Sequence, residues 1–371
     1  MTATRVHIIH GPWSETNTRA FFSPVFRCRA ELRDKGILVR FFSALTDAAT
    51  DADFLLLDDK YFGSAWDVRR TEILQQIEMI GNRGTALIYC DLGDSSGLIR
   101  VPALLRSRAY WKGYLLSDRS QYTVPHYGGR LFTDHYHRVD GVDDKKTSSS
   151  TAVPQDQLAK LHLSWGYGLT NHGLLANRAS SLFSRLPMPI LLNLPLQTAE
   201  PSGPRPLALS CRISTSHRRA SVVHQRLRLK SLLGDRIPTS RVSPRAFFAE
   251  LRQSRLVLSP FGWGEFAYRD YEAFVSGAAL VKPSMAHLET FPDYYRDNET
   301  MLPLRWDLAD LESTLSQALE RPAATQEIAR TAQNVYKYHV AAPEGRRDFA
   351  ERFQSLLLKC RGVAVKQHAA S

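Results

Sequence analysis

The sequence predicts an α/β fold of two domains, each built on its own parallel sheet. Apolar strands alternate with helices along residues 5–90, and the alternation starts again after residue 206. Such alternation is typical of open parallel sheets with helices on their faces. The segment 197–206 separates the two series and holds three prolines and a glycine in ten residues, which indicates a linker. With 371 residues, each half is long enough to bury its own core.

Four strands and two helices are predicted in the first half. The strands are short apolar runs bounded by glycine, proline or acidic residues, and they cover residues 5–10, 36–42, 53–58 and 85–90. The helices have apolar residues at helical spacing and cover residues 21–35 and 68–81. Ligands of an open parallel sheet bind at the carboxyl ends of its strands. We therefore expect ligand contacts within residues 10–17, 58–61 and 91–96.

An aromatic and basic stretch follows at residues 100–136. Between Tyr110 and Arg130 it is rich in Tyr, Trp, Lys and Arg, and two interpretations of this part are open. Sugar rings stack on aromatic faces, and cations suit acidic glycans or lipid diphosphates, so the stretch is suited to an acceptor. Tyr and Trp also pack in ordinary cores, so a structural role is equally compatible with the pattern.

The second half repeats the alternation after the linker. Strands are predicted at residues 207–211, 256–258 and 278–281. Helices are predicted at residues 220–233, 244–254, 265–275, 307–320, 323–339 and 345–359. The last of these helices is followed by a polar tail.

The run from Ser259 to Pro283 indicates a phosphate site. Gly262 and Gly264 allow a sharp turn between a strand and a helix, and Gly277 suits the end of that helix. A glycine turn that leads into a helix N-terminus binds anions well. Arg269 and Glu272 are three residues apart, so they share one helix face. A cation for phosphate beside a carboxylate for a ribose diol indicates a bound nucleotide, although the two side chains can also simply pair with each other.

This run resembles the nucleotide-sugar-binding motif of GT-B glycosyltransferases, especially the exostosin-like and bacterial group 1 types. The matching residues are Pro260, Gly262, Gly264, Arg269, Glu272, Ala273, Gly277 and Pro283. The resemblance covers about 50 residues, from Leu256 to Leu304, and the rest of the chain is only compatible with it. It implies a GT-B-like α/β fold, in which two Rossmann-like domains face each other across a cleft and the C-terminal helix crosses back to the first domain.

The resemblance also implies a division of the chain and an activity. Residues 1–196 are expected to form the acceptor-binding domain, 197–206 the linker, 207–340 the nucleotide-sugar-binding domain, and 341–371 the C-terminal helix and tail. The implied activity is transfer of a sugar from a nucleotide-sugar donor to a glycan or lipid-linked acceptor. The implied setting is bacterial surface polysaccharide or lipopolysaccharide synthesis. The sequence does not identify the sugar.

The donor site is expected to combine the motif with nearby loops. Arg212 follows a predicted strand directly, where a cation is well placed for a diphosphate, and Arg218 lies close behind it. Arg269 is expected to bind phosphate oxygens, and Glu272 takes the ribose role that similar families give this glutamate. The other expected donor-site residues are Glu265, Tyr268, Asp270, Lys282 and His287. Of these, Glu265 or Asp270 is expected to face the sugar, and Lys282 and His287 follow the next strand, where they can cap the base or the sugar.

A catalytic base is required if the transfer is a direct displacement. The candidates in the first half are Asp91, His10, Glu15 and Asp94. Asp91 is preferred because it ends a buried strand and is held rigidly there. Asp91 or Asp94 can equally cap a following helix. A retaining reaction needs no such base, and the sequence does not decide the stereochemistry.

Composition limits the partners. The net charge is +11, and residues 205–255 carry twelve basic residues against Asp235 and Glu250. This segment suits phosphates or peripheral contact with an anionic membrane, and a solvated helix face is favoured for Arg226, Arg228 and Lys230. No apolar run is long enough for a membrane span, and no signal peptide is recognisable. Four scattered cysteines indicate a reduced, cytoplasmic protein. No metal site and no cofactor is expected.

Two other function classes remain as alternatives. The basic segment is compatible with a nucleic-acid-binding protein, but helix-turn-helix, RNP and zinc-finger signatures are absent from the sequence, so no nucleic-acid partner is expected. A nucleotide-dependent enzyme of another class, such as an oxidoreductase, is the second alternative. The first strand is followed by Gly11-Pro-Trp-Ser14 and not by the dinucleotide-binding glycine pattern.

Overall fold

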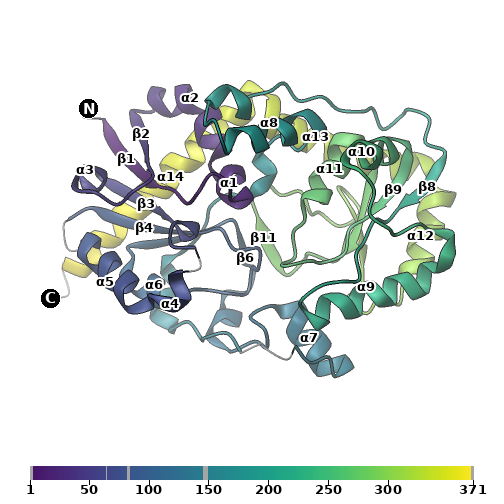
Figure 1. The fold of residues 1–371 in the computed structure, drawn as a ribbon, viewed down its shortest axis with the longest axis horizontal. Helices are drawn as coiled ribbons and strands as arrows, with labels where there is room; N and C mark the ends of the chain where they lie inside the picture. Colours follow the sequence, from purple (N-terminus) through teal and green to yellow (C-terminus); the bar gives the residue numbers. More distant parts are fainter. Residues whose placement is uncertain (1–2, 64, 82–83, 145–148, 369–371) are drawn as a thin grey trace.

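Two parallel sheets lie side by side in the computed structural model, which describes residues 3–63, 65–81, 84–144 and 149–368 (Figure 1). The first sheet has six strands, all of them from the first half of the chain. The second sheet has four strands, all from residues 207–304. The predicted α/β fold is confirmed, because every pairing within these two sheets is parallel.

The first sheet has the strand order β2-β1-β3-β4-β5-β7. The strands are β2 (Ile37–Phe42), β1 (Thr4–Ile9), β3 (Phe54–Asp58), β4 (Ala86–Asp91), β5 (Ala109–Lys112) and β7 (Leu161–Leu163). Successive side chains of a strand point to opposite faces. In β3, Leu56 accordingly belongs to the hydrophobic core on one face of the sheet, and its neighbours Leu55 and Leu57 belong to the core on the other face.

Helices cover both faces of the first sheet. One core contains residues of α1 (Thr16–Arg27), α2 (Arg29–Asp34) and α14 (Pro343–His368), and the other contains residues of α5 (Arg70–Gly81) and α6 (Val101–Arg106). Shorter or peripheral helices are α3 (Asp47–Thr50), α4 (Ala65–Val68), α7 (Leu131–Asp140) and α8 (Leu174–Phe183). In Figure 1, α8 and α7 lie at opposite edges of the molecule, beside the second sheet's helices.

The second sheet has the order β12-β10-β9-β8. Its strands are β12 (Leu302–Leu304), β10 (Ala279–Pro283), β9 (Ser254–Leu258) and β8 (Leu207–Ser210). Its helices are α9 (Ala220–Leu233), α10 (Pro244–Gln253), α11 (Tyr268–Ser276), α12 (Leu311–Glu320) and α13 (Pro322–Ala341). These helices pack on both faces of the sheet, because Val257 and Leu258 again fall into different cores.

A short antiparallel ribbon joins the two halves. It pairs β6 (Tyr114–Leu116) from the first half with β11 (Leu288–Thr290) from the second. Beside it, the Arg119 guanidinium donates to the Glu289 carboxylate at 2.6 Å. The two sheets are therefore connected by hydrogen-bonded backbone as well as by side chains.

The last helix returns to the first sheet, as the resemblance implied. Phe349 and Phe353 of α14 contact Trp165 with ring centroids 5.0 and 5.6 Å apart. Arg352 donates to the backbone carbonyls of Leu163 and Ser164 at 2.7 Å. In Figure 1 this helix runs from α13 across to the edge of the molecule that holds the N-terminus.

Several predicted elements differ at their ends. The helix expected at residues 21–35 begins five residues earlier and is divided at Cys28 into α1 and α2. The helix expected from Glu265 begins only at Tyr268, because the Asp270 carboxylate accepts from the Ala267 backbone N–H and fixes the helix start there. Lys282 lies inside β10 and not in the loop after it.

Two further observations concern membranes and metals. Within the described ranges, no helix is long and apolar enough to cross a membrane. In the same residues, no group of three or more His, Cys, Asp or Glu side chains is arranged to hold a metal ion. The four cysteines are buried and unpaired.

Candidate active site

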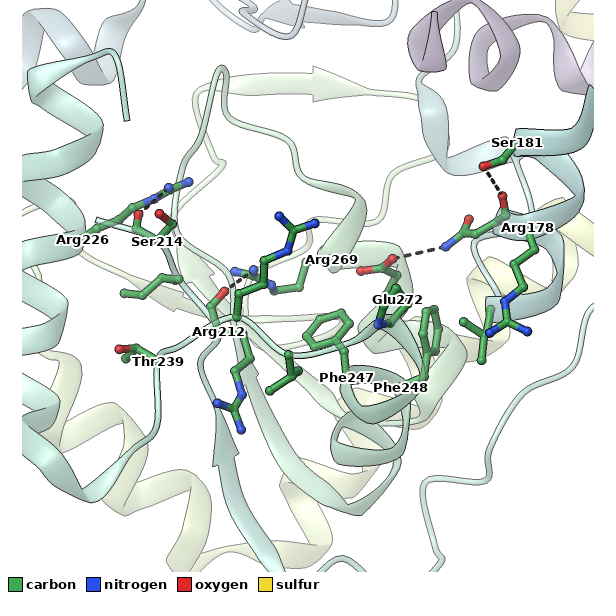
Figure 2. Close-up of a pocket in the computed structure, with 16 residues that line it drawn as sticks. Arg178, Ser181, Arg212, Ser214, Arg226, Thr239, Phe247, Phe248, Arg269 and Glu272 are labelled. Atoms are coloured by element: carbon green, nitrogen blue, oxygen red, sulfur yellow. Dashed lines mark hydrogen bonds between the residues drawn. The ribbon is translucent and has the colours of Figure 1, made fainter. Parts of the chain in front are cut away.

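A cavity of about 580 Å³ lies between α8 of the first half and the carboxyl edge of the second sheet. This volume suits a ligand of nucleotide size. Figure 2 shows its lining residues, which come from α8, the loop after β8, α9, α10 and α11. They are Leu174, Asn177, Arg178, Ser181, Arg212, Ile213, Ser214, Arg226, Thr239, Arg241, Val242, Pro244, Phe247, Phe248, Arg269 and Glu272.

Glu272 lines this cavity, as predicted for a ribose-binding carboxylate. It lies on α11 and faces α8, where the Asn177 side-chain amide donates to its Oε1 at 3.3 Å (Figure 2). Burial raises the pKa of Glu272 to about 7, and the nearby Arg269 only partly opposes this. The carboxyl group is therefore mostly, but not fully, shielded from water and has unused acceptor capacity, which suits a ligand with hydroxyl donors.

Arg269 lines the same cavity and does not form an ion pair with Glu272. Its guanidinium donates to the backbone carbonyl of Arg212 and lies 5.9 Å from the ring centroid of Phe247. Its Nε is buried and has no hydrogen-bond partner among the described residues. A cation with unused donors at the wall of a cavity is suited to an anionic ligand.

Arg212 is placed at the cavity as predicted, but its side chain is already paired. Its guanidinium donates to both carboxylate oxygens of Glu250, with Nε at 2.9 Å from Oε2, and to the Ser240 carbonyl at 3.1 Å. A phosphate contact of this side chain stays a prediction, since the guanidinium lines the cavity but is held by Glu250. The backbone of Arg212 also contributes, because its carbonyl holds Arg269.

Three arginines and a histidine lie beside the glycine turn, and Arg269 lies near one of these arginines, Arg226. Arg130 donates to the backbone carbonyl of Trp263 at 2.5 Å, and Arg219 lies over the Trp263 ring at 5.5 Å. The Arg226 guanidinium lies 3.8 Å from the position that a Cβ on Gly262 would take. We call Arg130, Arg219, Arg226, Arg269 and His217 the cationic cluster.

The members of the cationic cluster lie close enough together to lower one another's pKa values. Burial and the charge of Arg219 together lower the pKa of Arg130 to about 10. Burial and the charges of Arg226, Arg219 and Arg130 lower the pKa of His217. The hydrogen bonds from Arg130, Arg226 and Arg269 go to backbone carbonyls. Crowding buried cations costs stability, so an anion such as a diphosphate would relieve it.

Gly262 and Gly264 have different roles. A Cβ on Gly262 would meet only Arg226, so this residue leaves open space beside the cationic cluster. A Cβ on Gly264 would lie 1.6 Å from the backbone oxygen of Asp94. Gly264 therefore allows the two halves to touch, and the prediction that it contacts a donor is corrected.

A second cavity, of about 230 Å³, lies between the two halves beside the glycine turn. It is lined by Asn17, Asp94, Tyr167, Gly262, Trp263, Phe266, Ala267, Tyr268 and Tyr271. Asn17 bridges the halves, because its amide donates to Asp94 at 2.8 Å and accepts from the Tyr268 hydroxyl at 2.9 Å. Tyr268 is thus a residue of the second cavity and of the contact between the halves.

Asp94 is the predicted base candidate that lines a cavity. Burial raises its pKa, and the hydrogen bond from Asn17 and the charges of Lys60, Arg130 and Lys112 only partly oppose this. A carboxylate with a raised pKa is a better proton acceptor near neutral pH. Its position beside Gly262 places it close to the cationic cluster.

Asp91 was the preferred base, and the structure places it in a buried ion pair. Its Oδ2 accepts from the Lys112 ammonium at 2.7 Å and the Tyr110 hydroxyl at 2.6 Å, and its Oδ1 accepts from the Gly93 N–H. Burial alone would raise the pKa of Asp91, but Lys112 and these hydrogen bonds hold it below its ordinary value. Asp91 therefore stabilises the carboxyl edge of the sheet, and its assignment as the base is corrected.

Three other predicted donor-site residues are buried in structural contacts. Glu265 accepts from the Ser96 hydroxyl at 2.7 Å and from the Ser96 N–H at 3.1 Å, so it ties the halves together. Asp270 and Lys282 form a fully buried ion pair at 3.2 Å. Asp270 also accepts from the Ser259 and Tyr295 hydroxyls. The expectation that these side chains face a sugar or a base is corrected.

The remaining predicted residues lie away from the two cavities. His10 stacks on Trp13 with centroids 4.0 Å apart, and burial lowers its pKa. Glu15 is exposed at the start of α1, and Arg218 is exposed in the loop after β8. His287 packs edge-on against Trp306 with centroids 4.9 Å apart. Roles for these four in the reaction stay predictions.

Of the five members of the cationic cluster, sequence reasoning assigned only Arg269 to the donor site. Arg130 begins α7 after Gly128 and Gly129, both of which have positive φ, and this glycine pair was the available signal. Arg219 and Arg226 belong to the segment whose charge excess was noticed, but Arg226 was assigned to a solvated face. The aromatic residues Tyr110, Trp111, Tyr114 and Tyr122 are buried in the core, so the structural interpretation of that stretch holds for them.

Comparisons with known proteins concern the fold. No family model matches this chain, and no curated protein matches its sequence. Among solved structures it is similar to an alpha-glucosyltransferase in complex with UDP-glucose and DNA containing an abasic site, at 10% identity and a TM-score of 0.40, over 96% of this chain and 100% of that one. It is similar to Anabaena HepE in complex with UDP-glucose, at 10% identity and a TM-score of 0.43, over 95% of this chain and 100% of that one.

A glycosyltransferase from Rickettsia africae is similar at 9% identity and a TM-score of 0.45, over 96% of this chain and 99% of that one. These likenesses span nearly the whole of each chain. In its own topology this chain has two parallel sheets, a ribbon between them and a last helix that returns to the first sheet. This arrangement is the α/β fold of two parallel sheets with a returning C-terminal helix that the motif resemblance implied.

Proposed function

We propose that this protein transfers a glycosyl group from a nucleotide-sugar donor to an acceptor hydroxyl. The observation that carries the proposal is the cationic cluster. The Nε atoms of Arg219, Arg226 and Arg269 are buried and have no hydrogen-bond partner among the described residues, and Arg226 lies beside the open position at Gly262. A diphosphate is the ligand whose charge and acceptor number match such a site. Glu272, in the same cavity as Arg226 and Arg269, then supplies an acceptor for the ribose hydroxyls.

The reaction follows from the two cavities and the turn between them. Asp94 takes the proton from the acceptor hydroxyl, and that oxygen forms a bond to the anomeric carbon of the donor. The bond from the anomeric carbon to the diphosphate oxygen breaks, and the leaving diphosphate keeps the electron pair. The cationic cluster stabilises the charge that develops on the diphosphate, which is the usual largest contribution to such a step. This route inverts the anomeric centre.

The acceptor and setting rest on the motif resemblance. We include in the proposal a glycan or lipid-linked acceptor, a role in bacterial surface polysaccharide or lipopolysaccharide synthesis, a cytoplasmic location, no metal, and peripheral contact with an anionic membrane. Nucleic-acid binding is less favoured, because Arg226 and Arg269 line a cavity and do not form an open basic surface.

Donor binding is tested with a panel of UDP-, GDP- and ADP-sugars in thermal unfolding and in a hydrolysis assay. A bound donor raises the melting temperature in proportion to the logarithm of its concentration. Arg226→Gln should weaken binding about tenfold, because it removes a charge-assisted contact. Arg228→Gln on the same helix is the matched control and should bind as the wild type does. No response to any donor would contradict the proposal.

The role of Asp94 is tested separately by Asp94→Asn. The variant should bind the donor normally and lose about 100-fold or more of the transfer rate, because general base catalysis is removed. In the wild type, the rate should rise with pH to a plateau as the carboxyl group, whose pKa burial raises, loses its proton. A retained configuration in the product, or a fully active variant, would exclude Asp94 as the base.

A further inference from the structure

Asn17 is the second residue of α1, and its side-chain amide makes hydrogen bonds to both halves of the molecule. Its Nδ2 donates to the Leu92 carbonyl at 3.0 Å and to Asp94 Oδ1 at 2.8 Å. Its Oδ1 accepts from the Tyr268 hydroxyl at 2.9 Å. A backbone carbonyl can only accept, so the nitrogen of the amide has to face Leu92 and Asp94, and the oxygen has to face Tyr268. Both amide hydrogens are therefore used, and the side chain has one orientation.

The backbone at Asp94 is held by the second half of the chain. Gly264 approaches it so closely that a Cβ at this glycine would lie 1.6 Å from the Asp94 carbonyl oxygen. Two residues further on, the N–H and the hydroxyl of Ser96 donate to the Glu265 carboxylate at 3.1 and 2.7 Å. This backbone can therefore shift only if the halves separate, and the direction of the Asp94 side chain is what remains to be set.

The Asp94 carboxylate has one oxygen held and one oxygen open. Oδ1 accepts from Asn17, whereas Oδ2 accepts no hydrogen bond from any side chain or backbone group in the part of the chain that the structure describes. The last torsion of an aspartate side chain has only a weak preference of its own, so a hydrogen bond decides which way the carboxylate points. Because Asp94 lines the second cavity, the open Oδ2 is available to a hydroxyl group bound there.

Tyr268 connects this carboxylate to the helix of the donor site. It is the first residue of α11, the helix on which Arg269 and Glu272 line the first cavity. Its hydroxyl group has one hydrogen, which it donates to Asn17. A chain of hydrogen bonds therefore runs from α11 through Asn17 to the Asp94 carboxylate, and it crosses from the second half to the first.

We propose that Asn17 is a positioning residue, which holds Asp94 Oδ1 so that Oδ2 faces the acceptor hydroxyl, and that Tyr268 holds Asn17 in turn. The inference rests on the proposed function, because it takes Asp94 as the base. It makes the aim of the base depend on contact between the halves, since the amide is fixed only while α11 is in place.

The surroundings of Asp94 allow this role to be read from the pH dependence of the rate. Burial raises the pKa of Asp94, and the hydrogen bond from Asn17 opposes this together with three nearby cations. Removing only the bond from Asn17 should raise the pKa of Asp94, because that bond stabilises the ionised carboxylate. The midpoint of the rise in rate with pH should then move to a higher pH. The charged and titratable side chains that face Asp94, all retained in an Asn17 variant, are the cations Lys60, Arg130 and Lys112 and the tyrosines Tyr114, Tyr167 and Tyr268.

Hydrolysis of the donor tests the proposal, with water in the place of the acceptor hydroxyl. The probe is the sugar nucleotide that raises the melting temperature of the wild type most in the panel of UDP-, GDP- and ADP-sugars. Asn17→Ala should lower kcat about tenfold or more, because the base is no longer aimed. It should leave KM for the donor within about twofold and move the pH midpoint upward. Tyr268→Phe keeps the ring and removes only the hydroxyl, so kcat should fall in the same direction by a smaller factor.

Thr16→Ala is the matched control, because Thr16 is exposed beside Asn17 on α1 and its hydroxyl oxygen accepts from the Arg19 guanidinium. It should keep the wild-type kcat and pH midpoint. A wild-type kcat in Asn17→Ala would overturn the proposal, and so would a lower kcat with the wild-type pH midpoint, which a general loosening of the contact would give. Should Asn17→Ala fail to fold, an unchanged kcat in Tyr268→Phe would overturn it.

Asp94→Asn separates this inference from the function on which it rests. If Asp94→Asn were fully active, the base assignment itself would be wrong. If Asp94→Asn were inactive and Asn17→Ala were fully active, only the positioning role would be wrong.

Discussion

At the scale of single residues, burying the carboxyl group of Glu272 lowers the free energy of unfolding, and this can be tested. Its pKa is raised to about 7 by burial, from 4.5 in the unfolded chain. Between these two values the native state keeps its proton and the unfolded state loses it, so rising pH favours unfolding. Above about pH 7 the full penalty is present. It is about 1–2 kcal/mol once solvent screening of this partly exposed group is considered.

Glu272→Gln should therefore be more stable than the wild type at pH 8 by about 1–2 kcal/mol, and equal to it near pH 4. The same variant should bind a nucleotide-sugar about tenfold more weakly, because a charged acceptor is lost. Urea unfolding at the two pH values measures the first effect and titration of the donor measures the second. If the variant and the wild type were equally stable at both pH values, the buried charge of Glu272 would carry no cost. If the donor affinity were unchanged, Glu272 would not belong to the ribose site.

Gly262 and Gly264 are two residues apart, but replacing each by alanine should change the free energy of unfolding by very different amounts. Gly264→Ala places a methyl group against the Asp94 backbone, which has no flexible end to move, so the halves must separate. We expect a loss of about 3 kcal/mol or more in the free energy of unfolding. Gly262→Ala meets only the end of Arg226 at 3.8 Å and should unfold within about 0.5 kcal/mol of the wild type, with weaker diphosphate binding. Equal destabilisation of the two variants in denaturant titrations would refute this distinction.

At the scale of elements, α11 is held at its N-terminus by a buried ion pair. Asp270 accepts from Ser259, Tyr295 and the Ala267 N–H, and pairs with Lys282 of β10. The pair thus ties the helix that carries Arg269 and Glu272 to the central strands of its sheet. Burial lowers the pKa of Lys282, although the charge of Asp270 opposes this.

Lys282→Met should cost about 3–5 kcal/mol, because it leaves the Asp270 carboxylate buried without its cation. Adding Asp270→Asn to this variant should recover part of the loss, since the uncompensated charge is removed. A double-mutant cycle in guanidinium unfolding measures the coupling. Strictly additive losses would mean that the two side chains do not depend on each other.

Seven strands were predictable because each is a short apolar run, and their observed ends differ from the predicted ones by one or two residues. Five further short strands, β5, β6, β7, β11 and β12, were not predicted. Helix starts were less predictable. Glu265 has no local signal against a helix. Its tertiary bonds to Ser96 hold it outside α11, and the bond between Asp270 and the Ala267 N–H fixes the helix start after it. Lys282 was assigned to a loop because a lysine inside a central strand is rare, and its partner Asp270 is twelve residues earlier in the chain.

The candidate site was only partly predictable for the same reason. Arg269 and Glu272 share a helix turn, so local spacing identified them. Arg130 reaches the Trp263 carbonyl from 133 residues away, a separation across which no spacing rule operates. Arg212 and Asp91 looked free in the sequence because Glu250 and Lys112, which neutralise them, are brought near only by folding.

At the scale of the whole molecule, the last helix completes the core of the first half. Phe353 is fully buried against Trp111 and Trp165. Phe353→Ala should cost about 3–5 kcal/mol, as for other large buried aromatic residues. The change in Trp fluorescence during urea unfolding reports mainly on the first half, since four of the six tryptophans, Trp111 and Trp165 among them, lie there. A loss below about 1 kcal/mol would show that α14 is only loosely attached.

The return of α14 has a consequence for the order in which the protein is made. Domains generally fold as they leave the ribosome, with the N-terminal one first. Here the face of the first sheet that α1 and α2 cover is incomplete until α14, with Phe349, Phe353 and Cys360, has been synthesised. The first half of the nascent chain therefore has to wait for the last helix, and the second sheet, although made later, can be complete before it.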